Sequence, residues 1–245
     1  MNKVAILTGS TGEIGTSILE KLLELDYIVY AIGRNFENEK FKKIYKKLVA
    51  ENNSKKLCTI YYDFKNINNI SKLVQTIYNK EQRIDLLVCA HGISLNSLAI
   101  DTKIEEIVEI INVNQVSTII MSNEVIKYML KTDTEKNIIN ISSIWGTRAA
   151  SCESIYASTK AGLEMYSKSI AVEYAKSNIR VNTIAPGYID TKMNKFTETE
   201  KKEIMQEIPL GKFGNTEEIA KTVEYIINSK YLTAQTISIN GGWLA

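Results

Sequence analysis

The sequence predicts a doubly wound α/β fold, in which a parallel sheet carries helices on both faces. Short apolar runs rich in β-branched residues alternate with helical patterns along the whole chain. The apolar runs are nearly continuous, as expected for strands that are covered on both faces. No linker, repeat or low-complexity tract interrupts the alternation, so residues 1–245 are expected to form a single domain.

The expected strands begin with residues 4–8, which read VAILT and are followed by Gly9. A second strand at 27–32 is stopped in the same way by Gly33. Further strands are expected at 57–62, 84–90, 137–141, 179–184 and 236–239.

The expected helices follow from apolar residues three or four positions apart, as in residues 14–25. Further helical patterns cover residues 37–51, 67–78, 102–130, 154–177 and 217–227. Residues 186–216 are the least regular region, and an irregular segment of this length in a compact domain is usually functional. We expect residues 188–212, with a helix-compatible stretch at 198–208, to act as a substrate lid.

The composition excludes several classes of protein. Lys and Arg number 30 against 28 Asp and Glu, a net charge of +2, which does not favour a nucleic-acid or membrane-surface binder. No apolar run approaches the roughly 18 residues of a membrane span. Cys58, Cys89 and Cys152 lack the spacing of metal ligands. Free thiols in a reducing cytoplasm and no metal site are therefore expected.

A glycine-rich turn, TGSTGEIG at residues 8–15, joins the first strand to the first helix. Such a turn lets backbone N–H groups approach a pyrophosphate, and the helix N-terminus attracts the same anion. Arg34 follows the second strand, with no acidic residue beside it in the sequence. An arginine there suits a 2′-phosphate, so NADP(H) is the expected cofactor, although a solvated surface arginine is the alternative.

Tyr156 and Lys160 lie four residues apart, on one face of the helix expected at 154–177. A free tyrosine has a pKa near 10, and a neighbouring ammonium group would lower it. Ser143, 13 residues before Tyr156, follows the strand at 137–141. It is therefore expected at the carboxyl edge of the sheet, where ligands of such folds bind.

These motifs resemble those of the short-chain dehydrogenases/reductases, and the resemblance covers essentially the whole chain. Further matches are Asn114, PGYIDT at 186–191 and INGGW at 239–243. The resemblance implies a Rossmann-type fold and a catalytic set. Ser143 would orient the substrate oxygen, Tyr156 would exchange its proton, Lys160 would hold the nicotinamide ribose and lower the pKa of Tyr156, and Asn114 would hold a relay water.

The same resemblance implies the residues that contact the cofactor. They are Gly9, Thr11, Gly12, Ile14, Gly15, Arg34, Asp63, Ala90, Gly92, Tyr156, Lys160, Pro186, Gly187, Ile189 and Thr191.

Within that family the chain looks most like the bacterial 3-oxoacyl-acyl-carrier-protein reductases, especially in residues 209–220. This implies NADPH-dependent reduction of a 3-oxoacyl thioester in fatty acid biosynthesis. Two alternatives remain. One is reduction or oxidation of a sugar or other small polar carbonyl compound, with Arg148 facing an anionic group. The other is a dinucleotide-sensing protein without catalysis.

Three departures from the family pattern bear on these alternatives. Glu13 and the added Gly12 give the TGxxGxxG spacing of longer relatives that act on nucleotide sugars, and Glu13 is expected to point away from the pyrophosphate. His91 stands in the segment CAHG where the family has NNAG; we expect a hydrogen-bonded packing residue, with a proton-relay or substrate role as the alternative. Lys127 and Val172 occupy the positions of two carrier-docking arginines, which weakens the carrier-protein assignment.

The two longest helical segments, 102–130 and 154–177, carry apolar residues outside their main faces. Examples are Ile119, Met121, Met165 and Ile170. The resemblance implies that such helices pair across a two-fold axis and that the chain forms a homotetramer.

Overall fold

A computed structural model describes residues 3–37, 39–51, 53–191 and 196–243. Within these residues, seven strands form one all-parallel sheet, as the sequence predicts, and their order is β3-β2-β1-β4-β5-β6-β7. The strands are β1 (Val4–Thr8), β2 (Ile28–Gly33), β3 (Leu57–Tyr61), β4 (Leu86–Cys89), β5 (Lys136–Ile141), β6 (Ile179–Pro186) and β7 (Thr236–Ile239).

Strand β1 shows why the apolar runs are continuous. All five of its residues are buried, and it pairs on both sides, with Ala5 opposite Val29 of β2 and Leu86 of β4. The strand order reverses direction at β1, because β2 and β3 lie on one side of it and β4 to β7 on the other. In open α/β sheets, ligands bind outside the carboxyl ends of the strands at such a reversal.

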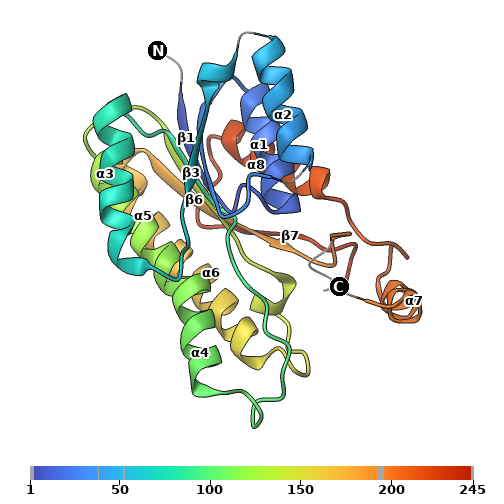
Figure 1. The fold of residues 1–245 in the computed structure, drawn as a ribbon. Helices are drawn as coiled ribbons and strands as arrows, with labels where there is room; N and C mark the ends of the chain where they lie inside the picture. The colour runs from blue at the N-terminus through green and yellow to red at the C-terminus, as the bar shows by residue number, and fades with distance from the viewer. Residues whose placement is uncertain (1–2, 38, 52, 192–195, 244–245) are drawn as a thin grey trace.

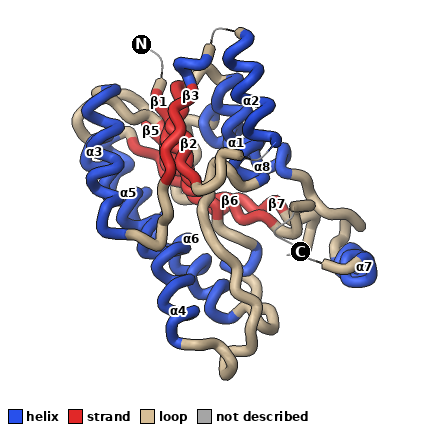
Figure 2. Tube along the Cα trace, in the orientation of Figure 1, coloured by secondary structure: helices blue, strands red, loops and turns tan. Residues whose placement is uncertain are grey.

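Helices cover both faces of the sheet (Figures 1 and 2). The helices of one face are α1 (Glu13–Glu24), α2 (Glu39–Ala50) and α8 (Thr216–Asn228), and those of the other are α3 (Ile70–Glu81), α5 (Ser117–Met129) and α6 (Ser154–Tyr174). Helix α4 (Ile104–Ile111) extends beyond the sheet beside α6, and α7 (Glu198–Glu207) projects away from the body of the molecule.

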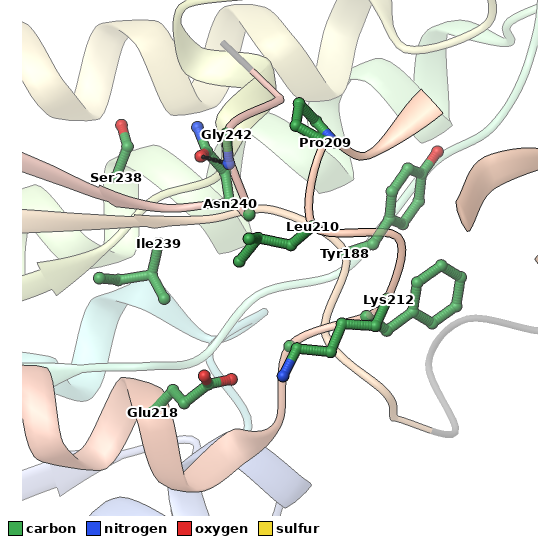
Figure 3. A pocket seen from close by; sticks show the side chains of 12 residues that line it. Tyr188, Pro209, Leu210, Lys212, Glu218, Ser238, Ile239, Asn240 and Gly242 are labelled. Atoms are coloured by element: carbon green, nitrogen blue, oxygen red, sulfur yellow. Dashed lines mark hydrogen bonds between the residues drawn. The ribbon is translucent and has the colours of Figure 1, made fainter. Parts of the chain in front are cut away.

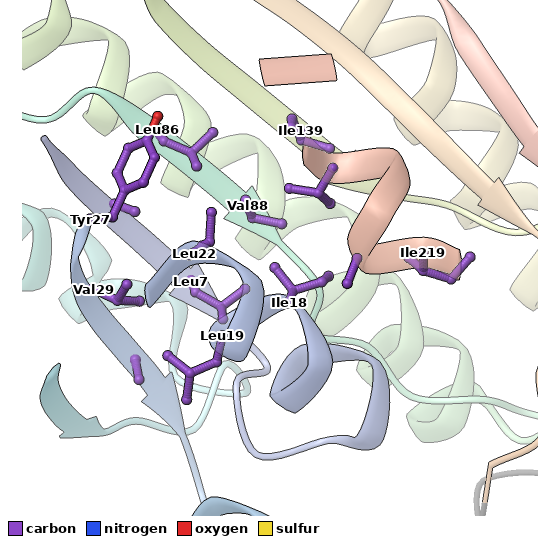
Figure 4. Packing of buried hydrophobic residues seen from close by; sticks show 14 of the residues in the cluster. Leu7, Ile18, Leu19, Leu22, Tyr27, Val29, Leu86, Val88, Ile139 and Ile219 are labelled. Atoms are coloured by element: carbon purple, nitrogen blue, oxygen red, sulfur yellow. The ribbon is translucent and has the colours of Figure 1, made fainter. Parts of the chain in front are cut away.

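The core under α1 confirms the periodicity read from the sequence. Ile18, Leu19 and Leu22 are fully buried and belong to one cluster with Leu7 of β1 and Ile219 of α8 (Figure 4). Burial of one such side chain stabilises the fold by roughly 1.5–3 kcal/mol. This packing fixes the start of α1, and with it the glycine-rich turn, against the ends of β1 and β4.

The helical stretch expected at 102–130 is interrupted. Between α4 and α5 the chain forms a π-helical segment, Asn112–Val116, whose wider turn accommodates one extra residue. Asn114 is buried inside this segment. Such π-helical insertions occur often at functional sites, because they redirect one side chain without ending the helix.

Residues 198–208 form the helix that their pattern allows, as α7. Its N-terminus is closed by a capping box, in which Thr197 Oγ1 accepts the N–H of Glu200 at 3.3 Å and Glu200 Oε2 accepts the N–H of Thr197 at 2.7 Å. No residue of α7 is fully buried, so the capping box is the best-defined interaction that stabilises this helix. Residues 192–195 of the expected lid lie outside the described residues. None of the helices in the described part of the chain is long and apolar enough to cross a membrane.

Candidate active site

The glycine-rich turn contacts the end of β4. Gly9 has a φ of +65°, and a Cβ at this position would lie 2.5 Å from the carbonyl oxygen of Ala90. A Cβ on Gly15 would overlap the carbonyl oxygen of Gly9. Side chains at either position would therefore force the turn away from the sheet.

Gly12 has a different role, because it is the N-cap of α1 and faces open space. A Cβ here would meet only the carbonyl oxygen of Gly9, at 3.4 Å. The first N–H groups of α1 are thus accessible to an anion, as a pyrophosphate requires. Thr11 lies against the end of β2, and the side chain of Ile14 packs on the core below the turn.

Arg34 meets an acidic residue that its sequence neighbours do not show. Its Nη1 lies 3.6 Å from Oδ2 of Asp63, which follows the adjacent strand β3. The neighbours of Arg34 in the sequence do not reveal this acid, because it is the pairing of β2 with β3 that brings the two strand ends together. An exposed pair of this kind contributes only about 0–1 kcal/mol, so it does not hold the guanidinium away from a phosphate.

Ser143, Tyr156 and Lys160 meet at the carboxyl end of β5. Burial raises the pKa of Tyr156 to about 12, and a hydrogen bond with the Ser143 side chain acts in the opposite direction. Lys160 Nζ lies 5.6 Å from the centre of the Tyr156 ring and donates to the carbonyl oxygen of Ile141 at 3.0 Å. Burial lowers the pKa of Lys160 to about 8.

This arrangement corrects the expectation that Lys160 lowers the pKa of Tyr156. The phenol is buried, and desolvation of its anion outweighs the effect of neighbouring groups. The hydroxyl of Tyr156 is consequently protonated at neutral pH. In this state it is a proton donor for a substrate oxygen.

Asn114 holds the loop that follows β4. Its Oδ1 accepts the N–H of Ile93 at 2.8 Å, and its Nδ2 donates to the carbonyl oxygen of Ile93 at 2.9 Å and to Thr159 Oγ1 at 3.4 Å. The neighbouring Gly92 faces the same group, because a Cβ there would lie 3.2 Å from Asn114 Oδ1 and 3.6 Å from Lys160 Nζ. The side chain of Asn114 thus positions the backbone beside Lys160.

His91 is a hydrogen-bonded packing residue, as expected. Ser117 Oγ donates to the carbonyl oxygen of Val113 at 2.7 Å, so it accepts from His91 Nε2, also at 2.7 Å. The other nitrogen, Nδ1, then accepts from Thr8 Oγ1 at 2.6 Å. The ring also stacks on Phe64, with their centres 3.8 Å apart. Burial and the charge of Lys160 lower the pKa of His91 to about 3, so the imidazole is neutral.

The remaining cofactor residues of the prediction lie along the same edge of the sheet. Ala90 follows β4 and donates its N–H to Thr8 Oγ1 at 3.2 Å. Pro186 ends β6, Gly187 donates its N–H to the carbonyl oxygen of Ile239 at 2.8 Å, and Ile189 is buried. Thr191 immediately precedes the undescribed residues 192–195.

A cluster of aromatic side chains beside the site was not anticipated. The ring centres of Trp145 and Trp243 are 5.3 Å apart, and that of Tyr188 lies 4.6 Å from Trp243. Phe196 and Phe213 extend the cluster from Tyr188. The sequence does hold a signal for it, because Tyr188 and Trp243 stand inside the matched motifs PGYIDT and INGGW and Trp145 lies two residues after Ser143.

Arg148 packs against this cluster and is half-buried, and its contact with an anionic group of a substrate stays a prediction. Its guanidinium carbon lies 4.5 Å from the centre of the Trp243 ring, and Nη1 donates to the carbonyl oxygen of Trp243 at 3.1 Å. A cavity of about 460 Å³ adjoins the cluster at Tyr188, between the loop after α7 and the end of β7 (Figure 3). Leu210 and Asn240 line it from these two segments.

Glu153 also lies at the site and was not singled out from the sequence. It is the N-cap residue of α6, three positions before Tyr156. Asn96 Nδ2 donates to its Oε1 at 3.4 Å, while Oε2 is buried and has no hydrogen-bond partner among the described residues. Burial raises the pKa of this carboxyl group.

Comparison with known proteins decides the family. The family model described as short chain dehydrogenase matches residues 3–202. The chain belongs to the short-chain dehydrogenase/reductase family. This short-chain dehydrogenase/reductase is therefore an NAD(P)-dependent oxidoreductase that acts on the carbonyl/alcohol pair.

Two curated relatives cover nearly all of this short-chain dehydrogenase/reductase. A 3-oxoacyl-acyl-carrier-protein reductase of Rickettsia conorii is 35% identical over 99% of this chain and 97% of its own length. Carbonyl reductase family member 4 of Xenopus laevis is 34% identical over 99% and 98%. Among solved structures, a 4-hydroxyisoleucine dehydrogenase complexed with NADH is 27% identical, with a TM-score of 0.85 over 99% of this chain and 98% of that one.

Proposed function

We propose that the chain is an NADPH-dependent reductase of ketone groups, with Ser143, Tyr156 and Lys160 as its catalytic residues. The observation that carries the proposal is the meeting of these three side chains at the carboxyl end of β5, where Tyr156 is hydrogen-bonded to Ser143 and lies beside Lys160. Ser143 would polarise the ketone oxygen and Tyr156 would give it a proton. Lys160 would hold the ribose, and Asn114 would fix the neighbouring loop. NADPH bound at this site would supply the hydride for the carbonyl carbon.

The first candidate substrate is a 3-oxoacyl thioester, because a 35% identical relative carries the name of such a reductase. A small polar carbonyl compound is the second candidate, favoured by the surface where a carrier protein would dock. Val172, at one of the two docking positions, is an exposed apolar residue and supplies no positive charge there. Oxidation of NADPH over a panel of 3-oxoacyl thioesters, keto sugars and simple ketones tests the proposal. A dinucleotide-sensing protein would reduce none of them.

We expect kcat/KM to be at least about tenfold higher with NADPH than with NADH. Replacement of Arg34 by alanine is expected to abolish this preference. A charge-assisted contact to a 2′-phosphate contributes roughly 1.5–3 kcal/mol, and NADH lacks this phosphate. Values of kcat/KM for both cofactors give the result. Lys55→Ala, an exposed cation just before β3 at the opposite end of the sheet, is the matched control. Equal kcat/KM for the two cofactors, unchanged in Arg34→Ala, would contradict the assignment.

The tetramer is also part of the proposal. On α4 and α6 the apolar residues Ile104, Val108, Met165 and Val172 are 75%, 52%, 63% and 76% exposed, and such a surface favours association. Met121 and Ile170 do not contribute to it, because both are buried in the core of the chain, contrary to the expectation. Light scattering at micromolar concentration is expected to give the mass of four chains, and Val172→Glu to reduce it. A monomeric mass for the unmodified protein would reject the assembly.

We further propose that α7, in the segment 188–212, covers the bound cofactor and substrate. The helix has no buried residue, so its amide hydrogens are expected to exchange rapidly in the free protein. Addition of NADPH should slow exchange in residues 198–208, and less so in Thr191→Ala. Closure would exclude water from the reacting carbonyl. Identical exchange with and without NADPH would show that α7 is an ordinary surface helix.

A further inference from the structure

The side chain of Glu164 lies buried beneath the loop that carries Ser143. Glu164 is on α6, one turn after Lys160, and only 5% of it is exposed. A carboxyl group is costly to bury unless it is hydrogen-bonded. Its partner is the residue next to Ser143, because Ser142 Oγ donates to Glu164 Oε1 at 2.7 Å. A buried hydrogen bond thus joins α6 to the chain directly before the proposed catalytic serine.

The loop also packs against this carboxyl group at its other end. A 3₁₀ turn has Ser143 as its N-cap and ends at Gly146. A Cβ at Gly146 would overlap Glu164 Oε1 and would lie 3.1 Å from Ser142 Oγ. The backbone of Gly146 is therefore packed on the carboxyl group, and Ser143 lies between two residues that Glu164 contacts.

The same part of α6 also holds the end of β5. Lys160 Nζ donates to the carbonyl oxygen of Ile141 at 3.0 Å, and Ser142 Oγ lies 3.3 Å from the carbonyl oxygen of Lys160. Ser142 also donates its N–H to the carbonyl oxygen of Ile184 in β6 at 2.7 Å. The chain therefore leaves the sheet at a fixed point, and Glu164 is the group that holds it beyond that point.

We propose that Glu164 is a positioning residue, which holds the loop so that the hydroxyl of Ser143 meets that of Tyr156. It acts on the reaction without touching the substrate. This inference rests on the proposed function, because Ser143 is one of the proposed catalytic residues. Without the carboxyl group Ser143 would lose its fixed place, and a displacement of about 1 Å at a reacting group can lower a rate about 10²-fold.

Removal of the carboxyl group tests this role. In Glu164→Ala we expect kcat to fall about 10–100-fold. The Kd for NADPH should be unchanged, because Glu164 contacts the loop after β5 and not the glycine-rich turn. Ser142→Ala breaks the same hydrogen bond from the other side and is expected to lower kcat likewise. The double variant should be no slower than Glu164→Ala, since the two residues act through one interaction.

Ser143→Ala distinguishes positioning from a merely structural role. In this background the hydroxyl that Glu164 holds in place is absent, so Glu164→Ala should lower kcat by less than about threefold. A general loosening of the fold would instead lower kcat by the same factor with and without the Ser143 hydroxyl. If Glu164→Ala does not fold, Ser142→Ala completes the same cycle.

Glu164→Gln restores an acceptor oxygen at the position of Oε1, and we expect it to recover most of the kcat that Glu164→Ala loses. Burial lowers the pKa of Lys160 to about 8, and the charge of Glu164 acts in the opposite direction. The comparison is therefore made at pH 6, where Lys160 is charged. Glu20→Ala, on the exposed face of α1, is the matched control and should keep the kcat of the unmodified protein.

Three results would each overturn the inference and leave the proposed function intact. They are an unchanged kcat in Glu164→Ala, the same loss with and without the Ser143 hydroxyl, and a Glu164→Gln variant as slow as Glu164→Ala. A Ser143→Ala variant with full activity, or no NADPH oxidation with any ketone or thioester, would reject the proposed function and the inference with it.

Discussion

Replacement of Tyr156 by phenylalanine is expected to lower kcat by about 10²–10⁴, while NADPH still binds. The variant keeps the ring and loses only the hydroxyl, which is the proton donor to the oxygen of the ketone. Burial raises the pKa of this hydroxyl to about 12, so it is protonated throughout the neutral range. The loss is therefore expected at every pH from 6 to 8.

Steady-state NADPH oxidation gives kcat, and the fluorescence of bound NADPH gives its affinity. Tyr225→Phe, on the exposed side of α8, is the control that removes a hydroxyl far from the site. In Lys160→Ala both turnover and NADPH affinity should fall, because the role proposed for Lys160 includes holding the nicotinamide ribose. A Tyr156→Phe enzyme that retains a third of the activity would show that another group supplies the proton.

The second large effect is on stability in mild acid, through the only histidine of the chain. The pKa of His91 falls from 6.5 to about 3 on folding. Between these values the unfolded chain binds a proton that the folded protein does not, so the free energy of unfolding decreases as the pH falls from about 6.5 towards 3. Protonation would also turn Nδ1 into a donor against Thr8. Because the residue as a whole keeps some contact with solvent, this pKa difference sets only an upper limit of roughly 5 kcal/mol on the loss of stability.

Urea unfolding at pH 7, 6 and 5 measures this loss. In His91→Asn, whose side chain does not titrate, the free energy of unfolding should change less over the same range. Glu153 and Glu164, whose pKa values are raised, act in the opposite sense, since their contribution is gained as the pH falls. Both glutamates remain in His91→Asn, so their contribution to the pH dependence is the same in the two proteins and cancels in the difference. If the free energy of unfolding depended on pH in the same way in both proteins, His91 would not be responsible for the loss of stability in acid.

The sequence predicts the architecture because the signals for it are local. The run at Val4–Thr8 has to be a strand covered on both faces, and the spacing of Ile18 and Leu22 has to be a helix with one buried side. The same holds for the catalytic set, since Tyr156 and Lys160 share one helix and Ser143 follows the preceding strand. These residues come together whenever the strand before Ser143 and the helix that carries Tyr156 and Lys160 pack in the predicted sheet.

What the sequence does not predict depends on contacts between distant segments. The π-helical turn at Asn112–Val116 has the same apolar pattern as an α-helix, so periodicity cannot distinguish the two. The pKa of Tyr156 follows from its burial, which the residues around it in the sequence do not reveal. The pairing of Arg34 with Asp63 requires β2 and β3 to be neighbours.

The positions of the two tryptophans have a practical consequence for spectroscopy. Trp145 and Trp243 are the only tryptophans of the chain, and their rings are in contact with each other beside Tyr188. All the indole emission of the protein therefore originates at the mouth of the site. Its intensity and wavelength report on occupancy of this region without an attached label. Because NADPH absorbs light in the range in which indoles emit, energy transfer from this pair gives a direct optical signal of cofactor binding.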